Sequence, residues 1–130
     1  MSRSESKIIA IDFDGTCVEH EYPGIGLDAE GAVKTLRDLN AKGHRIILYT
    51  MRSGELLEAA VKWFKQRDIK LWAINENPEQ KSWTSSPKSH ADIYIDDSAL
   101  GCPVRFIEGV RRPVADWTKI RAILEYNNLL

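Results

Sequence analysis

Two aspartates, Asp12 and Asp14, are separated by a single residue at the end of a short apolar run and are the clearest chemical signal in the sequence. Side chains of an extended segment alternate between faces, so both carboxylates point the same way. Converging carboxylates are unfavourable unless a cation or a proton compensates them. A hard divalent cation such as Mg²⁺, which prefers oxygen ligands, meets that need.

Polar residues suited to binding an anion follow the later apolar runs. A hydroxyl group and the N–H groups of a helix start come after the second run, at Thr50, Arg52 and Ser53. The fourth run ends in a second acidic pair, Asp96 and Asp97, and Lys88 lies shortly before it. Carboxylates for a metal, with hydroxyl, amide and ammonium donors for an anion, indicate Mg²⁺-assisted phosphoryl transfer.

The elements that must position these residues alternate between strand and helix. Short β-branched apolar runs predict strands over residues 8–13, 44–50, 71–74 and 91–95, with a further edge strand over 104–107. Helical periodicity predicts helices over 28–42, from Ser53 onward, and after Pro113. Asp28 is the expected N-cap of the first helix and Gly43 its stop. The polar stretch 75–90 predicts a loop with one weak helical turn.

This alternation implies right-handed βαβ units. We therefore expect an α/β fold, a three-layer sandwich whose Rossmann-like central parallel sheet carries helices on both faces. Ligands bind at the carboxyl ends of the strands in such sheets, which is where the reactive residues stand. A single domain is expected over residues 1–130, with 1–6 disordered and 127–130 frayed.

Composition and charge exclude several function classes. The 130-residue chain has a net charge of -1, so no global basic field drives non-specific binding to nucleic acid. No apolar run approaches the roughly 18 residues of a membrane span. Asp12 comes too early for a signal peptide, so we expect a cytoplasmic protein. Cys17 and Cys102 are expected to be reduced thiols.

Asp-Phe-Asp-Gly-Thr at residues 12–16 resembles the signature of the haloacid dehalogenase (HAD) superfamily. Thr50, Lys88 and the pair at 96–97 follow in the family's order, so the resemblance spans residues 7–100. It implies a HAD-like fold and a phosphoric monoester hydrolase. The short segments 16–28 and 75–88 leave no room for a cap domain. The chain therefore resembles the capless branch, whose open sites accept macromolecular ends or are covered by a neighbouring subunit.

The resemblance also assigns a role to each signature residue in the reaction. Asp12 would attack phosphorus and form an aspartyl-phosphate, and Asp14 would protonate the leaving oxygen and then activate water. Thr50 would hydrogen-bond the phosphoryl group. Lys88 would neutralise its developing charge, with Lys81 of the same loop as the alternative.

The same resemblance implies a set of metal ligands. Mg²⁺ would be bound by Asp12, by the backbone carbonyl of Asp14 and by Asp96. Asp97 would either bind the metal directly or support its ligands without contacting it, and the sequence leaves both options open.

The expected function is a Mg²⁺-dependent phosphatase acting on a phosphorylated substrate of unknown size. A polynucleotide-end phosphatase is one alternative, suggested by Thr-Met-Arg at 50–52, although the near-neutral charge gives no strong nucleic-acid signal. A non-catalytic or regulatory phosphoryl-binding protein on the same scaffold is another. A homo-oligomer that covers the open site is a further hypothesis.

Several other polar residues have competing interpretations. Arg52 would either grip a second anionic group of the substrate or pair with Glu55 or solvent. His20, in the short flap over 19–26, would either contact substrate or be a solvated loop histidine, and the solvated histidine is the expectation. Arg111 and Arg112 would either contact a phosphorylated partner or lie in a solvated turn, and the turn is the expectation for two adjacent arginines.

Overall fold

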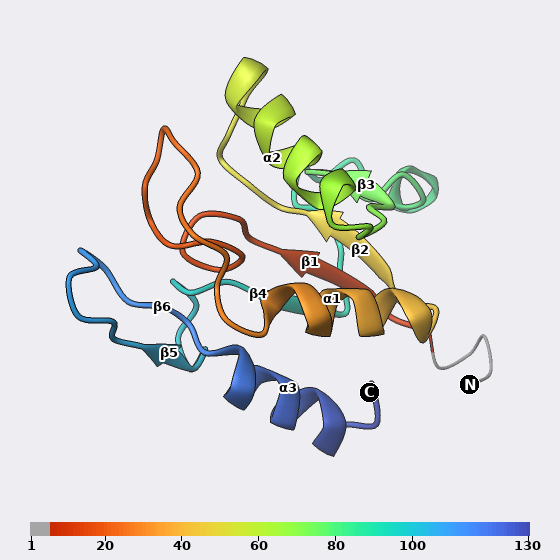
Figure 1. The fold of residues 1–130 in the computed structure, drawn as a ribbon. Helices are drawn as coiled ribbons and strands as arrows, with labels where there is room; N and C mark the ends of the chain where they lie inside the picture. The colour runs from red at the N-terminus through yellow and green to blue at the C-terminus, as the bar shows by residue number, and fades with distance from the viewer. Residues whose placement is uncertain (1–5) are drawn as a thin grey trace.

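The computed structural model describes residues 6–130 (Figure 1). The expected disorder over residues 1–5 lies outside the described residues. Ser6 is anchored, because its Oγ donates a hydrogen bond to the Gly43 carbonyl at 2.7 Å. Over residues 6–130, none of the helices combines the length and the hydropathy that crossing a bilayer requires.

Four parallel strands form the central sheet, in the order β3-β2-β1-β4. Their bounds are Ile8–Ile11 for β1, Arg45–Leu48 for β2, Ala73–Ile74 for β3 and Ile93–Ile95 for β4. β1 pairs with β2 on one side and with β4 on the other, and all its residues are buried. A strand covered on both faces needs apolar residues at successive positions, which explains its unbroken apolar run. The predicted main-sheet strands are confirmed, each shorter than its apolar run.

Three helices pack against one face of this sheet. They are α1 (Ala32–Ala41), α2 (Gly54–Gln66) and α3 (Trp117–Tyr126). Their buried residues, among them Leu36, Phe64 and Trp117, share one hydrophobic cluster with Ile9 and Ile11 of β1. Full burial of a large apolar side chain contributes about 1.5–3 kcal/mol. This face therefore carries most of the apolar stabilisation of the fold.

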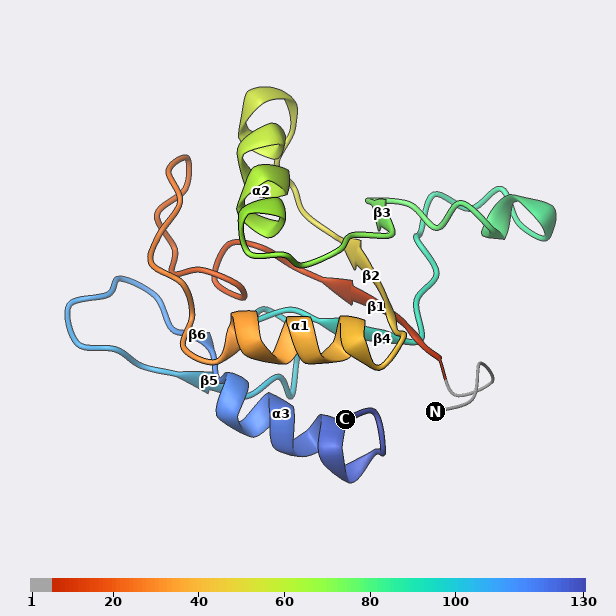
Figure 2. The same cartoon turned by 45° about the vertical axis from the view of Figure 1, so that its right-hand side comes forward.

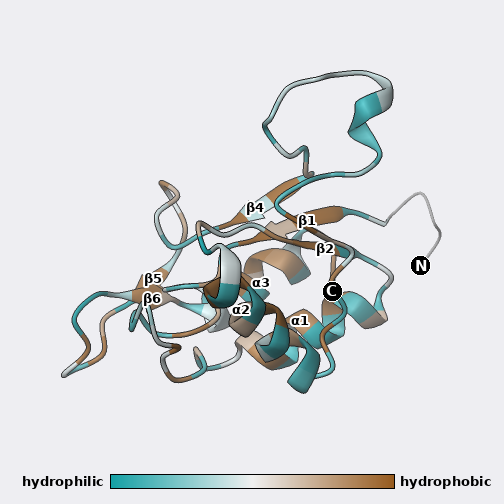
Figure 3. Cartoon of the chain, turned by 90° about the horizontal axis from the view of Figure 1, so that it is seen from above, coloured by the Kyte–Doolittle hydropathy of each residue, from teal (hydrophilic) through white to brown (hydrophobic). Residues whose placement is uncertain are grey.

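The opposite face of the sheet is covered differently. Ile8, Ala10 and Ile47 belong to a second, smaller hydrophobic cluster. On this side lies the segment 75–91, whose single helical turn is the 3₁₀ helix η2 (Gln80–Ser82), as Figure 3 shows. The parallel α/β architecture is confirmed, and so is the predicted loop with one turn. That loop stands where the expected three-layer arrangement would place helices.

The first helix begins later than the sequence predicts. α1 starts after Gly31, whose φ is 86°, and Asp28 is not its N-cap. The Asp28 carboxylate instead accepts hydrogen bonds from Nε1 of Trp63 and from Nε and Nη2 of Arg67, each at 2.9 Å. These donors, on α2 and just beyond it, hold Asp28 in the segment between the flap and α1. The predicted stop at Gly43 is confirmed by its φ of 88°.

The predicted edge strand over 104–107 belongs to a separate hairpin. β5 (Val104–Arg105) pairs antiparallel with β6 (Val114–Ala115) in a sheet of their own. The base of the hairpin is fixed to the loop after β1, because Ala115 N–H donates to the Gly15 carbonyl at 2.9 Å. Nε1 of Trp117 donates to the Thr16 carbonyl at 2.6 Å. The expectation of an edge strand on the main sheet was therefore wrong.

The carboxyl-terminal residues pack against the start of β2. Leu129 is 6% exposed and belongs to the main hydrophobic cluster. Nε2 of His44 lies 2.8 Å from the Leu129 carbonyl, and Nδ1 of the same ring accepts the Lys7 N–H at 3.0 Å. The expected fraying of residues 127–130 was wrong, because a buried leucine and a histidine hydrogen bond hold this end.

Candidate functional site

Three carboxylates converge where β1 and β4 end. Asp12 follows β1, and Asp96 and Asp97 follow β4. One oxygen from each residue lies within 4.8 Å of the others. The two acidic pairs sit on adjacent strands, which explains how residues more than 80 positions apart meet here. An all-oxygen donor set of this kind fits a hard divalent cation.

The crowding of these carboxylates perturbs the protonation of Asp12. Burial, the nearby charge of Asp96 and a hydrogen bond with Asp97 raise the pKa of Asp12 from 3.8 to about 8. Without a bound cation, ionising the Asp12 carboxyl group therefore costs free energy. A cation among the three carboxylates would remove that penalty, so the residues fit a metal ion.

Thr16 links the two acidic segments and was not among the expected site residues. Its buried hydroxyl lies 2.9 Å from Oδ2 of Asp12 and 3.1 Å from Oδ1 of Asp97. The same hydroxyl accepts the Asp97 N–H at 3.0 Å. Its place as the last residue of the 12–16 signature was the available signal.

His20 is buried against the acidic cluster, so the expectation of a solvated loop histidine was wrong. It is 8% exposed, and its Nε2 lies 2.9 Å from Oδ2 of Asp97. Gly15 makes this approach possible, since a Cβ at that position would overlap the His20 ring and crowd the Asp97 carboxylate. Gly15 also has a φ of 82°, a conformation that side-chain-bearing residues rarely adopt.

The two aspartates after β4 differ in their remaining coordination capacity. Both oxygens of Asp97 are engaged, one beside Thr16 and the other beside His20. Oδ1 of Asp96 accepts the Ser98 N–H at 2.9 Å, while its Oδ2 has no hydrogen-bond partner among the described residues. Asp96 is therefore the better placed of the two to offer an oxygen directly to a metal.

Arg52 holds Asp14 in a bidentate ion pair. Nε and Nη2 of Arg52 donate to the two Asp14 oxygens at 2.8 and 2.7 Å. Its remaining N–H groups reach backbone carbonyls of Pro23 at 3.3 Å, Gly24 at 2.6 Å and Leu56 at 3.3 Å. The Arg52 side chain is 1% exposed. Arg52 thus ties the flap and the start of α2 to Asp14.

A cavity of about 430 Å³ opens over these residues. The four aspartates, His20 and Thr50 line it from the strand ends and the flap. Arg111 and Arg112 line it from the β5–β6 loop. The expectation that this arginine pair lies in an exposed turn is confirmed, but the turn borders the candidate site.

The segment after β2 contributes one of its three predicted residues to this cavity. Thr50 lies in the lining, and its N–H donates to Oδ1 of Asn75 at 2.8 Å. Asn75 directly follows β3 and was not expected to position a site residue. Ser53 is the exposed N-cap residue of α2 and lies outside the lining.

The structure does not bring Lys88 into this group. Lys88 is exposed, and its Nζ lies 5.7 Å from the centroid of the Tyr94 ring. Lys81 lies beside a separate hollow formed within the loop 76–89. That loop projects from the molecule away from the flap and the β5–β6 loop, as Figure 2 shows. Neither lysine lines the cavity over Asp12.

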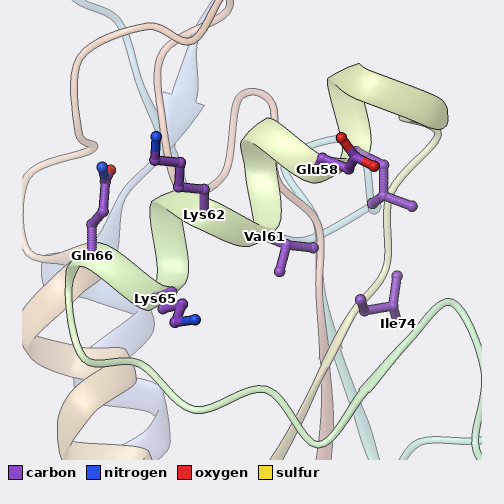
Figure 4. A pocket seen from close by; sticks show the side chains of 7 residues that line it. Glu58, Val61, Lys62, Lys65, Gln66 and Ile74 are labelled. Atoms are coloured by element: carbon purple, nitrogen blue, oxygen red, sulfur yellow. The ribbon is translucent and has the colours of Figure 1, made fainter.

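A larger hollow of about 780 Å³ lies elsewhere, on α2 beside β3. Figure 4 shows Val61 of α2 and Ile74 of β3 on this groove, with Lys62 and Lys65 at its margin. It is lined largely by aliphatic side chains and lysine stems. The carboxylates that could hold a metal ion lie in the acidic cluster and not in this groove.

The two cysteines are unpaired, as predicted. Cys17 is fully buried, and burial raises the pKa of its thiol well above the ordinary value. Its Sγ lies 3.4 Å from the Asp12 carbonyl, to which it donates. Because the thiolate is the reactive form, Cys17 acts as a packing residue beside the site.

No protein-family model matches this chain, and no curated protein matches it. A conserved protein of Bacteroides thetaiotaomicron has a solved structure similar to this one, with a TM-score of 0.77 and 37% sequence identity. The match covers 94% of this chain and 92% of the Bacteroides chain. At that identity and coverage, the chain belongs to the same protein family as the Bacteroides thetaiotaomicron protein.

Proposed function

We propose that this protein is a Mg²⁺-dependent phosphomonoesterase of the HAD type, acting through an aspartyl-phosphate on Asp12. The observation that carries the proposal is the convergence of Asp12, Asp96 and Asp97 beside Thr50 in one cavity. The order of these residues along the chain, which resembles the HAD signature, supports the same chemistry.

The reaction divides into two displacements at phosphorus. A carboxylate oxygen of Asp12 attacks phosphorus, the ester P–O bond breaks, and the leaving oxygen takes a proton from Asp14. Water then gives a proton to Asp14 and attacks the same phosphorus. The bond between phosphorus and Asp12 breaks, which releases phosphate and restores both carboxyl groups. Thr50 hydrogen-bonds the transferring group in both steps.

The proposed metal ligands are Asp12, Asp96 and the backbone carbonyl of Asp14. When bound, Mg²⁺ neutralises the carboxylates and polarises the phosphoryl oxygens. Asp97 holds its neighbours in place through Thr16 and His20, which supports a positioning role for it.

The ion pair with Arg52 sets a condition on this mechanism. Asp14 can give or take a proton only when one of its oxygens leaves the guanidinium. Arg52 also binds the flap carbonyls of Pro23 and Gly24, so movement of the flap on substrate binding would loosen this grip. The same ion pair favours the second candidate, a protein that binds a phosphoryl ligand without turnover.

The test is phosphate release from p-nitrophenyl phosphate, sugar phosphates, nucleotides and oligonucleotide ends, with Mg²⁺ or with EDTA. We expect release that needs Mg²⁺ and disappears in Asp12→Asn, with the variant still folded by circular dichroism. Release that persists in EDTA would exclude the proposal. Mg²⁺ and phosphate binding without release from any substrate would favour the second candidate.

A further inference from the structure

We propose that Arg111 and Arg112 are the phosphate-binding cations of this site and determine its preference for phosphomonoester dianions. This inference deepens the proposed phosphomonoesterase function and rests on it. Lys88, the lysine that the family resemblance assigns to the phosphoryl group, does not line the cavity. A site built from carboxylates needs positive charge from elsewhere to hold a phosphate.

Arg52 is not available for that role in this structure. A guanidinium has five N–H donors. Those of Arg52 point to both oxygens of Asp14 and to the carbonyls of Pro23, Gly24 and Leu56. Binding a substrate phosphate would therefore break bonds that hold the flap and Asp14.

Arg111 and Arg112 are the two arginines among the described residues that line the cavity. Both are exposed, and neither forms an ion pair among the described residues. Their guanidinium groups are therefore free to bind an anion, and the planar fork of arginine matches the oxygens of phosphate.

The charge balance of the cavity, with Arg52 paired to Asp14 as in this structure, favours this role for the two residues. Arg52 neutralises Asp14, which leaves three negative charges on Asp12, Asp96 and Asp97. A divalent cation reduces this to one negative charge, and a dianionic phosphate would still be repelled. The two arginines turn the balance positive by one unit.

The hairpin that carries them is built to hold them there. Its base is fixed by bonds from Ala115 to Gly15 and from Asp116 N–H to the Pro103 carbonyl, both at 2.9 Å. Its tip, over residues 106–113, and the flap both lie beyond the carboxyl end of β1 in Figure 1. The loop thus brings positive charge to the edge of the acidic cluster from a part of the chain far beyond Asp12.

The test compares Arg111→Ala/Arg112→Ala with the wild-type protein in Mg²⁺. We expect the KM for p-nitrophenyl phosphate to rise about ten- to hundredfold, with kcat changed by less than about threefold. The Kd for inorganic phosphate, measured by calorimetry, should rise by a similar factor. Arg111→Lys/Arg112→Lys should recover part of the affinity, since it keeps the charge but loses the fork.

The matched control is Arg105→Ala. Arg105 lies on the same hairpin, outside the cavity, and pairs with Glu30 at 2.7 Å. It should leave KM and the phosphate Kd unchanged. Circular dichroism and Mg²⁺ binding check that each variant is folded.

The outcomes separate this inference from the function it rests on. An active wild-type enzyme whose KM and phosphate Kd are unchanged in the double variant would overturn the inference and leave the proposed function intact. Phosphate binding that depends on the two arginines, without turnover by the wild type, would uphold the inference and overturn the proposed function. A wild-type protein that binds no phosphate would overturn both.

Discussion

Two loops of this molecule bury polar side chains, and they differ in whether those side chains are compensated by hydrogen-bond partners. The loop 76–90 buries Asn77, Gln80 and Ser89, yet each has its hydrogen bonds within the loop or to its ends. The loop after β1 instead places Asp12 beside two further carboxylates, and its pKa is raised to about 8. Buried polarity alone therefore does not mark a site here. The candidate site is marked instead by like charges that lie close together without a compensating cation.

The largest expected effect on stability concerns the contact that supports the acidic loop. Arg52→Ala leaves Asp14 without its partner and frees two flap carbonyls, so we expect a loss of about 3–5 kcal/mol in the free energy of unfolding. Urea denaturation measures it. Arg45→Ala is the matched control, since the Arg45 and Glu79 side chains of that pair are 37% and 64% exposed, and it should cost less than about 1 kcal/mol. Equal losses in the two variants would refute the bracing role of Arg52.

A substitution in the loop 76–90, whose buried side chains hydrogen-bond within the loop or to its ends, should lower the free energy of unfolding without affecting the candidate site. Gln80→Ala leaves the Ser86 and Lys88 carbonyls and the His90 N–H without their partner, at a cost of about 2 kcal/mol. Mg²⁺ affinity and kcat should stay unchanged. The control Gln66→Ala, on the exposed side of α2, should change stability by less than about 0.5 kcal/mol. A loss of Mg²⁺ binding in Gln80→Ala alongside the loss of stability would contradict the claim that this loop does not support the candidate site.

The raised pKa of Asp12 should make the metal-free protein sensitive to pH. The folded-state pKa, about 8, exceeds the ordinary 3.8, so the folded state binds the extra proton between these values. Stability should therefore fall steadily as pH rises from about 4 to about 8. In EDTA, Asp12→Asn should lie close to the wild type at pH 4 and exceed it increasingly toward pH 8. Identical pH profiles for the two proteins would contradict this.

The smallest expected effect is that of Lys88→Ala. Its Nζ lies over Tyr94 rather than in the cavity, so kcat and KM should change by less than about twofold. Steady-state kinetics with p-nitrophenyl phosphate measures this. A loss of more than about hundredfold would restore the role that the family resemblance assigns to this lysine.

Local features of the sequence were sufficient for the sheet and for the acidic cluster. The buried apolar run of β1 and the 12–16 signature are contiguous, and parallel strands bring their carboxyl ends together. The contacts of His20 with Asp97 and of Arg52 with Asp14 span 77 and 38 positions, and no local pattern encodes them.

The loops departed from expectation for a related reason. The position of Lys88 is set by hydrogen bonds within its loop, because the Lys88 carbonyl accepts from Nε2 of Gln80 at 2.9 Å. Asp28 has the composition of an N-cap, but donors from Trp63 and Arg67 compete for it. Arg111 and Arg112 reach the cavity only because β6 pairs with β5 and is bonded to Gly15.

The most direct measurement traps the covalent intermediate. Protein turning over a phosphomonoester in Mg²⁺ is quenched in acid and reduced with borohydride, which converts an aspartyl-phosphate to homoserine, and peptide mass spectrometry locates the change. We expect homoserine at position 12, more of it in Asp14→Asn because breakdown is slowed, and none in Asp12→Asn. Phosphate release without modification at position 12, or modification at Asp96 instead, would contradict the assignment of Asp12 as the nucleophile.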